Sequence, residues 1–473
     1  MRIIMNYLKK KLIGDKDFYK MVLAIVIPIT IQNGITNFVG LLDNIMVGRI
    51  GTEQMSGIAI VNQLMTVFNI SIFGAVSGAG IFTAQFFGCK DHEGVRQTFR
   101  FKLYVCLLLL AVGIAVFVFE GTNLIGLYLH GEGNEAALET TLGYGLKYLT
   151  IMLFGLLPFA LESVYTSTLR ECGETVLPMK AGIVAVFVNL ILNYLLIFGK
   201  FGFPKLGVVG AAIATVLSRY VQAGIVIVWT HRHTQEMPFI VGAFRSLRIP
   251  AGLCGKIILK GTPLMLNEFL WSAGMAMLMQ CYSIRGLETV AAMNISGTIS
   301  NLFNVAFVAM GNAVAIIVGQ LLGAGKMEEA KDQDTKLIAF TVFVCTVCGC
   351  IFAFAAPLFP MVYNTTENVK HLATSFLRIA ALCLPMWGFM HTAYFTLRSG
   401  GKTVITFLFD SAFLWCVTTP VAFVLSRYTD LPIVLLYLDC QLLDLLKCLV
   451  GFILVKKGVW IQNIVVDSEK KGS

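Results

Sequence analysis

The hydrophobic and polar positions of the chain form long apolar runs separated by short polar segments. Most of these runs meet the requirement of roughly 20 apolar residues for crossing a hydrocarbon core as a helix. They are continuous in Leu, Ile, Val, Phe, Ala and Gly, whereas the strands of a membrane barrel alternate over roughly 10 residues. The pattern predicts an all-α integral membrane protein with twelve transmembrane helices. The runs lie at 21–47, 56–87, 101–120, 142–168, 176–198, 207–230, 257–283, 290–322, 336–362, 376–397, 403–426 and 431–455.

Composition and charge place the chain in a membrane. Of its 473 residues, 57% are hydrophobic and only 13% are charged, too few for a surface that faces water on all sides. Lys and Arg number roughly 26 in the termini and even-to-odd loops against roughly 8 in the opposite loops. This bias predicts a multi-pass protein of the cell (inner) membrane with both termini cytoplasmic. The net charge of +9 is then explained by residues that face anionic headgroups, so no nucleic-acid partner is expected.

Several other chemistries are disfavoured by the motifs. The first 20 residues lack a small-residue cleavage site, so no removable signal peptide is expected. The twelve cysteines lie mostly inside apolar runs, which predicts neither a disulfide framework nor a zinc site. No GxxxxGK[ST] segment occurs, so ATP is not expected as the energy source, and no cofactor is predicted.

The chain carries an internal duplication. With Pro28 aligned on Pro263, the segment from Gly51 runs without a gap against the segment from Gly286, and TLRECGETV at 168–176 recurs as TLRSGGKTV at 396–404. Six spans in each half predict parallel repeats, that is, two pseudo-symmetric six-helix bundles. The expected organisation is a cytoplasmic amphipathic N-terminus (1–20), an N-lobe (21–230), a cytoplasmic linker (231–256), a C-lobe (257–455) and a cytoplasmic tail (456–473).

One acid lies where a charge is costly. Asp43 falls inside the first apolar run, and an ionised Asp at a helix centre costs roughly 2.5 to 3.5 kcal/mol. Burial favours the protonated carboxyl and a bound cation favours the carboxylate, so such a group can exchange a proton for Na+ or a cationic substrate. The alternative is that Asp43 lies near the outer interface and pairs with Arg49.

Short motifs in a fixed order resemble the MATE (multidrug and toxic compound extrusion) transporters. They are a proline in the first span, DNIMVGRIG, QFFG at the end of the second span, NLILNY at 189–194, and TLRxxGxT before the fifth and eleventh spans. The resemblance covers almost the whole chain. It implies a secondary active antiporter that exports organic, often cationic amphipathic compounds in exchange for H+ or Na+ by alternating access of two lobes.

The resemblance also implies residues for the cation. Asn189 and Asn193 share one helix face and match positions that surround the first-helix acid in the family; interhelical hydrogen bonding alone is the alternative. Asn37, Tyr194 and Thr215 are weaker candidates for the same cluster and are also candidates for the substrate cleft. In this reading Asp43 is the leading group for proton or cation coupling.

The C-lobe offers a different set of acids. Glu268 matches the seventh-helix acid that some members use for a cation and occupies the repeat position of Asn33. The acid that such members carry in the tenth helix is replaced here by Met386 and Trp387, so a C-lobe Na+ site looks incomplete. Asp410 is a candidate substitute if its helix turns it inward. No resident metal is expected, although Na+ could bind transiently near Asp43 or Glu268.

Other polar residues inside the spans are assigned to structure. Glu162 and Arg219 are expected to pair, as are Asp444 and Lys447. Soft and aromatic side chains suit a cleft for amphipathic cations, with ordinary packing as the alternative. The candidates are Met265, Tyr282, Phe303, Phe307, Met386 and Trp387.

The leading hypothesis is therefore a multidrug antiporter whose partners are small amphipathic molecules and membrane lipids, and we expect a monomer. A lipid-linked oligosaccharide flippase of the same broad superfamily is the alternative, and it needs several inward basic residues. Lys and Arg within the spans look few, which disfavours it. A membrane enzyme would need a catalytic constellation, and the six scattered histidines offer none.

Overall fold

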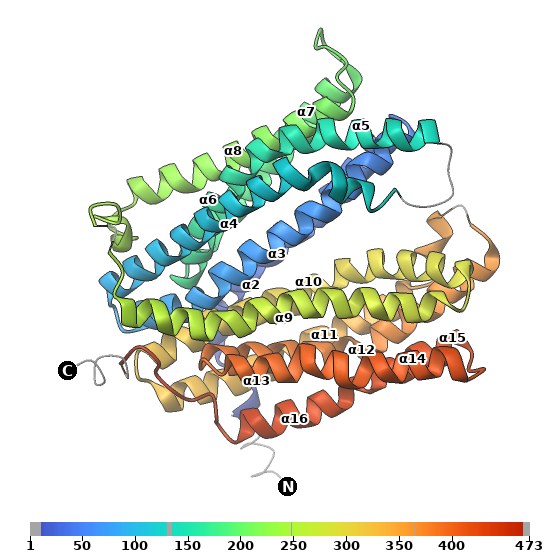
Figure 1. The fold of residues 1–473 in the computed structure, drawn as a ribbon. Coiled ribbons are helices and arrows are strands. Elements are labelled where there is room, and N and C mark those ends of the chain that lie inside the picture. The colour runs from blue at the N-terminus through green and yellow to red at the C-terminus, as the bar shows by residue number, and fades with distance from the viewer. Residues whose placement is uncertain (1–10, 130–134, 247, 364, 467–473) are drawn as a thin grey trace. The chain divides into compact units, whose positions relative to one another are not determined.

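The computed structural model describes residues 11–129, 135–246, 248–363 and 365–466, and this part of the chain is helical without a strand (Figure 1). Some of the helices are joined by short 3-10 turns, which are η1 (Leu153–Gly155), η2 (Pro238–Ile240) and η3 (Pro360–Val362). The helices are α2 (Lys16–Gly48), α3 (Thr52–Gly88), α4 (His92–Gly126), α5 (Glu135–Met152), α6 (Leu156–Glu171), α7 (Val176–Phe198), α8 (Val208–Arg232), α9 (Ala251–Ser283), α10 (Leu287–Gly323), α11 (Met327–Ala355), α12 (Glu367–Ser399), α13 (Thr403–Phe407), α14 (Thr419–Tyr428), α15 (Ile433–Leu442) and α16 (Asp444–Lys456).

Each predicted apolar run falls on one helix or on helices joined end to end. Ten helical segments of the described residues are long and apolar enough to cross a membrane. The two further runs correspond to α9 and to the successive helices α15 and α16. The run at 142–168 is carried by α5 and α6, which η1 joins, and the run at 403–426 contains two π-helical turns, η4 (Leu408–Ala412) and η5 (Leu414–Thr418).

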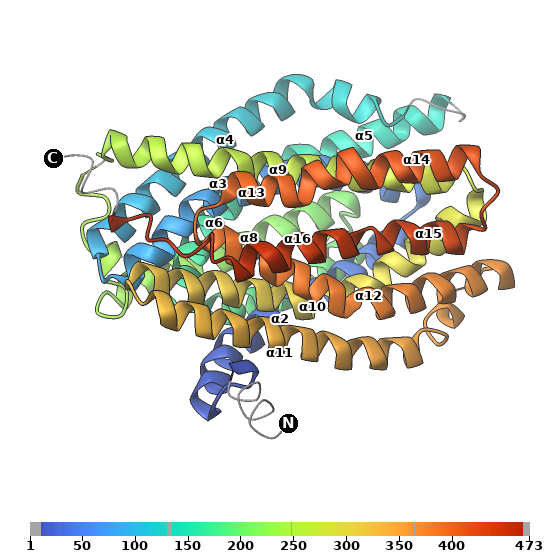
Figure 2. The same cartoon turned by 90° about the horizontal axis from the view of Figure 1, so that it is seen from below.

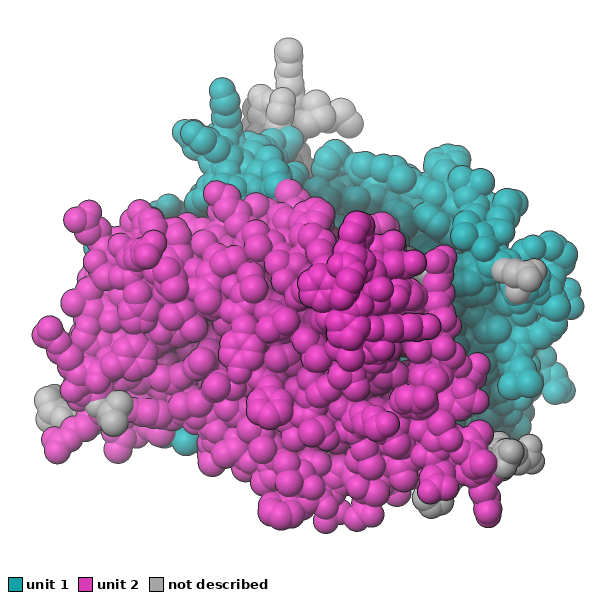
Figure 3. Space-filling view, turned by 90° about the horizontal axis from the view of Figure 1, so that it is seen from above, with its two compact units in different colours: residues 1–30, 84–91, 255–473 teal, residues 31–83, 92–254 magenta. Residues whose placement is uncertain are grey.

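The chain divides into two compact units, coloured separately in Figure 3. Unit 2 comprises residues 31–83 and 92–254; within it α7 packs along α8, and α5 and α6 also pack against α8. Unit 1 comprises residues 1–30, 84–91 and 255–473. Within unit 1, α12 packs against α10, α11 and α16, as Figure 2 shows. Residues 21–30 and 84–91 thus group with unit 1, although the sequence places them in the N-lobe, and the lobe boundaries stay a prediction.

The duplication is visible in the backbone where helices end. Positive φ angles recur in pairs at the two repeat offsets, a conformation in which side chains other than glycine are strained. At each pair one helix stops and the next begins after a tight turn. The pairs are Gly51 (154°) and Gly286 (109°), Lys90 (61°) and Gly325 (73°), and Gly173 (92°) and Gly401 (71°). The TLRxxGxT motif is therefore a helix–turn–helix signature whose glycine supplies the turn.

The ends of α3 and α10 cross backbone against backbone within unit 1. Both carry a QxxG segment, Gln85 to Gly88 and Gln320 to Gly323. A Cβ atom at Gly88 would lie 2.0 Å from the Gln320 carbonyl oxygen, and one at Gly323 would lie 1.9 Å from the Gln85 carbonyl oxygen. The repeated glycines therefore permit an approach that no other residue allows.

Replacing Gly88 or Gly323 by Ala is expected to lower the free energy of unfolding by about 1 to 3 kcal/mol, because a backbone carbonyl has to move. The apparent Tm of the purified protein measures this. Gly224→Ala is the matched control, since nothing lies within 4 Å of its added Cβ and Ala favours a helix. Equal Tm values for Gly88→Ala and Gly224→Ala would show that the crossing is not close.

The segment that follows α16 folds back onto this crossing. Gln85 is fully buried; its Nε2 donates to the Ser399 carbonyl (2.9 Å), and its Oε1 accepts from the Ile464 amide (2.9 Å). Asn463 Nδ2 donates to the Gly323 carbonyl (2.9 Å), and Trp460 is buried. Residues 458–466, called the C-terminal strap below, therefore pack against the helices of unit 1, although they belong to the predicted cytoplasmic tail (456–473). Residues 467–473 and, at the other end, 1–10 lie outside the described residues.

Candidate functional site

The Asp43 site joins α2 and α7 inside unit 2. Asn193 Nδ2 donates to Asp43 Oδ1 over 2.7 Å. Asn189 lies one turn earlier on the same face of α7, and with its amide turned towards Asp43 its nitrogen lies 3.0 and 3.1 Å from the two Asp43 oxygens. Its side chain also lies 3.4 Å from Thr215 Oγ1 on α8. The structure thus brings together Asp43, Asn189, Asn193 and Thr215.

The partners of Asp43 are neutral. Among the described residues no Lys, Arg or His nitrogen lies within 4.0 Å of its carboxylate, so the alternative ion pair with Arg49 is not formed. Arg49 is exposed, whereas Asp43 is half-buried. Asn193 Oδ1 is buried and has no hydrogen-bond partner among the described residues. Carboxylate oxygens next to an unsatisfied amide oxygen can accept a proton or a small hard cation.

Two weaker candidates lie apart from these hydrogen bonds. Asn37 is exposed on α2. Tyr194 is 46% exposed and contributes to an open apolar groove of about 370 Å³ lined also by Met46, Leu190, Ile191, Leu195 and Phe201. Neither side chain hydrogen-bonds to Asp43 in the described part of the chain.

The expected ion pair between Glu162 and Arg219 is wrong. Glu162 Oε1 accepts from Thr166 Oγ1 (2.7 Å) and from Gln222 Nε2 (3.0 Å). Arg219 instead donates to the Gly155 carbonyl (3.3 Å) and lies over the Phe159 ring. An amide and a hydroxyl satisfy the acid, while a carbonyl and an aromatic face receive the cation.

A buried ion pair in unit 2 was missed from the sequence. The Lys102 side chain is fully buried on α4; its ammonium contacts Glu171 on α6 and donates to Thr168 Oγ1 (3.1 Å). Arg170 donates to Gln32 Oε1 on α2 (2.6 Å). Basic residues inside the helices are therefore more numerous than expected from the sequence. Those described here are held by protein partners.

A second polar cluster lies in unit 1 at the π-helical turn η4. Asn267 Nδ2 donates to Asp410 Oδ2 (3.1 Å), and Asn267 Oδ1 accepts from Ser411 Oγ (2.6 Å). Lys447 Nζ lies 3.4 Å from Asp410 and 3.6 Å from Asp444, so the expected couple between Asp444 and Lys447 is formed. π-helical turns within α-helices are frequent at functional sites. Asp410 is thus turned inward, but it is paired with a cation.

Glu268 follows Asn267 on α9 and is half-buried. No hydrogen bond or ion pair joins it to another described side chain, which distinguishes it from Asp410. Asn267, its neighbour, is the residue that connects α9 to η4, and it was not predicted from the sequence. Only the neighbouring Glu268 was a candidate from the sequence, because an isolated Asn in an apolar run gives no indication of the residue that it binds.

Replacing Asn267 by Ala is expected to lower the free energy of unfolding by about 1 to 3 kcal/mol, because Asp410 and Ser411 would lose a buried partner. Thermal unfolding followed by tryptophan fluorescence measures the change. Asn294→Ala, at an exposed position of α10, is the control and should alter the Tm little. Equal effects of the two substitutions would contradict the assigned role of Asn267.

The predicted cleft residues of unit 1 are spread over packed and half-buried positions. Tyr282 is buried in a core cluster that includes Leu278 and Cys440. Phe303 stacks on Phe352 with ring centroids 4.0 Å apart, and Phe307 contacts His391. Met265, Met386 and Trp387 are half-buried, and Trp387 packs against a further cluster. Their contact with a substrate stays a prediction.

The described residues form neither a metal-binding cluster nor a disulfide. Within the described residues no three His, Cys, Asp or Glu side chains gather as a metal site. All twelve cysteines are free.

These features define a class: a multi-pass helical membrane protein built from a duplicated unit, with isolated acids inside its spans. The family model described as MatE matches residues 28–195 and 263–424. The two matches begin at Pro28 and Pro263, the prolines that the repeat alignment pairs, and together they cover more than half of the chain. The chain belongs to the MATE family.

Individual relatives agree over nearly the full length. The "Probable multidrug resistance protein NorM" of Thermotoga maritima is 26% identical over 471 residues, which cover 98% of this chain and 97% of that protein. The "Probable multidrug resistance protein YoeA" of Bacillus subtilis is 24% identical over 420 residues, covering 86% and 87%. The outward-facing structure of "a multidrug resistance MATE family transporter of the MOP superfamily" superposes with a TM-score of 0.82 at 20% identity, covering 98% of this chain and 99% of that one. The expected all-α fold of twelve spans in two six-helix halves is confirmed.

Proposed function

We propose that this protein is a secondary active multidrug antiporter, which exports organic, often cationic amphipathic compounds in exchange for H+ or Na+. The family makes it a transporter and not an enzyme, and its relatives carry the name multidrug resistance protein. The mechanism in this proposal is alternating access, in which the two repeated lobes rock and open a shared site to one side of the membrane at a time.

The observation that carries the proposal is the Asp43 carboxylate held by two asparagine amides. A carboxyl group with only neutral partners changes charge when it binds or releases a proton. A fixed cation beside it would compensate the carboxylate permanently and weaken its response to a transported cation. Asp43 therefore suits coupling, and the open Oδ1 of Asn193 offers a further ligand.

The same argument ranks the three acids. Glu268 has no hydrogen bond or ion pair within 4.0 Å to a described side chain, although the buried Arg398 interacts with its charge, so it follows Asp43 as a coupling candidate. Asp410 already faces Lys447 and Asn267, so we assign it to positioning within unit 1. Na+ or H+ thus has two candidate carboxylates, one in each half of the chain.

The proposed setting is the inner membrane, with both termini cytoplasmic and the protein acting as a monomer. Moving one charge through about 100 mV supplies roughly 2.3 kcal/mol, and each pH unit adds roughly 1.4 kcal/mol. Together these support severalfold to hundredfold gradients of an exported compound without ATP.

Efflux of a fluorescent cation from everted membrane vesicles tests the proposal. Gradients of pH and of Na+ are imposed separately on vesicles with and without the protein. Stimulation by one gradient, with no requirement for ATP, is the expected result and identifies the coupling ion. Transport that needs ATP and ignores both gradients would reject antiport.

A lipid-linked oligosaccharide flippase stays as the second candidate because buried basic residues exceed the expectation from sequence. Lys102 and Lys447 nevertheless face acids, and a flippase cavity needs basic groups available for a pyrophosphate. Translocation of a labelled lipid-linked sugar in the same vesicles, without any response of drug efflux to the gradients, would favour this function.

A further inference from the structure

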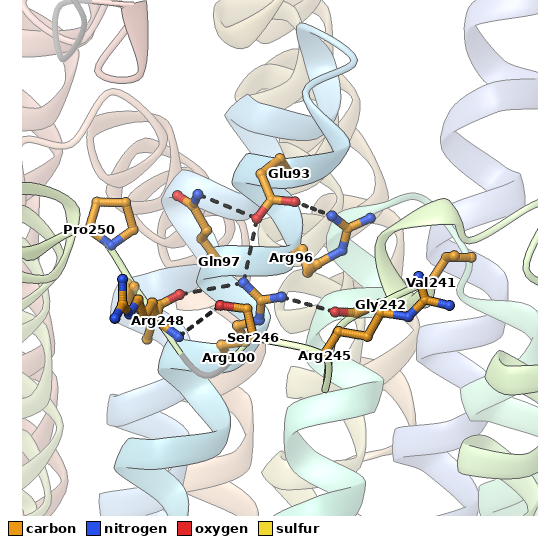
Figure 4. A pocket seen from close by; sticks show the side chains of 11 residues that line it. Glu93, Arg96, Gln97, Arg100, Val241, Gly242, Arg245, Ser246, Arg248 and Pro250 are labelled. Atoms are coloured by element: carbon orange, nitrogen blue, oxygen red, sulfur yellow. Dashed lines mark hydrogen bonds and ion pairs between the residues drawn. The ribbon is translucent and has the colours of Figure 1, made fainter.

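The segment between α8 and α9 forms a basic pocket with the start of α4. The pocket encloses about 630 Å³ and is shown in Figure 4. Four arginines and one glutamate line it, so its charged side chains leave an excess of positive charge. The charged lining residues are Glu93, Arg96, Arg100, Arg245 and Arg248. All belong to unit 2, and we call this the linker pocket.

Two of the arginines build the pocket. Arg100 is buried; its Nε donates to the Ala243 carbonyl (2.7 Å), and its terminal nitrogens donate to the carbonyls of Gly242 (3.0 Å) and Arg248 (3.4 Å). Arg96 Nε donates to the Phe239 carbonyl (3.0 Å). Both guanidinium groups also contact Glu93. Their donors therefore fix the linker backbone in place.

The other two arginines are open. Arg245 and Arg248 are exposed, and no acid lies within 4.0 Å of either guanidinium group in the described part of the chain. Glu93 is engaged by Arg96 and Arg100. The linker that carries the open pair is anchored, since Phe239, Ile240 and Ala243 are buried. A planar guanidinium group recognises the oxygens of a phosphate with two parallel hydrogen bonds.

The position of the pocket favours a lipid phosphate. It lies at the first turns of α4 and just beyond the last turn of α8, where two membrane-spanning helices end. Beside the arginines, Val241 and Phe244 are each 51% exposed. Basic side chains next to exposed apolar ones are the combination that binds the interface of an anionic bilayer. A soluble phosphate would gain nothing from these apolar neighbours.

We propose that the linker pocket binds the phosphate headgroup of an anionic phospholipid through Arg245 and Arg248, on a frame held by Arg96 and Arg100. A lipid seated here contacts both α4 and the linker. The proposal is independent of the coupling chemistry at Asp43, so either can fail without the other.

The test uses the full-length protein, freed of lipid in a neutral detergent, and titrations followed by native mass spectrometry. The probes are dioctanoyl-phosphatidylglycerol, dioctanoyl-phosphatidylcholine and inorganic phosphate. Each basic residue near an anionic headgroup contributes roughly a fivefold factor in affinity. Phosphatidylglycerol should therefore bind the parent protein more tightly than the other probes, and the double variant Arg245→Ala/Arg248→Ala should bind it about 30-fold more weakly.

The matched control is Lys456→Ala/Lys457→Ala, which removes the same charge from two exposed positions at the end of α16. It should change the affinity less than about twofold if the linker pocket is the site. Equal losses in both double variants would overturn the proposal in favour of diffuse attraction. If inorganic phosphate displaces the lipid and binds as tightly as phosphatidylglycerol, the proposal that the ligand is a phospholipid would be overturned. The Tm without lipid should be unchanged in both variants, since none of the four side chains lies in a packed core.

Discussion

Asp43→Asn is expected to abolish gradient-driven efflux, with a loss of at least about tenfold in the initial rate, while the protein still folds. The substitution keeps the shape of the side chain and its contact with Asn193, but it removes the group that changes charge. A neutral amide binds neither a proton nor Na+ strongly enough to draw on a gradient. Everted vesicles that hold equal amounts of parent and variant protein give the measurement.

Asp439→Asn is the matched control for this substitution. It makes the same chemical change at an exposed position of α15, so efflux should stay near the parental rate. The apparent Tm of Asp43→Asn should lie close to that of the parent, because the carboxylate is only half-buried. Parental efflux by Asp43→Asn would show that coupling resides elsewhere, with Glu268→Gln as the next variant to measure.

Lys102→Met is expected to cause the largest loss of stability among single substitutions of unit 2. Removing one partner of a buried ion pair costs up to about 3 to 5 kcal/mol, and Arg170, which also interacts with the Glu171 charge, offsets part of this cost. The Lys102 side chain is fully buried, and a Cβ at Gly80 would lie 2.1 Å from the Glu171 carboxylate, so Glu171 has little room to turn away. The apparent Tm in detergent and the yield of monodisperse protein report the loss.

The double variant Lys102→Met/Glu171→Gln should recover much of this loss, since no uncompensated charge remains. Lys370→Met provides the contrast, because its ion pair with Glu367 lies at the surface within one helix and contributes less than about 1 kcal/mol. A Lys102→Met protein as stable as Lys370→Met would show that the buried pair is not a structural requirement.

Hydrophobic periodicity and the internal repeat predict most of this fold, because each membrane span can be recognised from its own stretch of sequence. A run of apolar residues has to be a helix in lipid, since every backbone amide must be satisfied within the segment. The paired prolines and the TLRxxGxT turn then locate the duplicated halves. The cluster of Asp43, Asn189 and Asn193 was predicted from the resemblance to the MATE family, in which matching positions surround the first-helix acid. The spacing of the two asparagines shows only that they share a helix face.

Contacts between distant segments were not predictable in the same way. Lys102 lies at the edge of an apolar run, where a lysine normally extends its amine to the interface, so its partner Glu171 emerged only from the packing of α4 against α6. Arg219 and Glu162 were expected to pair because their charges are opposite. Instead Gln222 donates a hydrogen bond to Glu162, and Arg219 donates to the Gly155 carbonyl. Charge identifies candidates, whereas the three-dimensional geometry decides which candidates meet.

The C-terminal strap has a practical consequence for work on this protein. Ile464 hydrogen-bonds to the end of α3 and Asn463 to the end of α10, and the Trp460 backbone packs against Gly400 at the end of α12. A truncation before residue 458 therefore removes contacts of three helices at once. Affinity tags and fluorescent fusions should therefore follow residue 466, so that detection or purification does not itself alter the transporter.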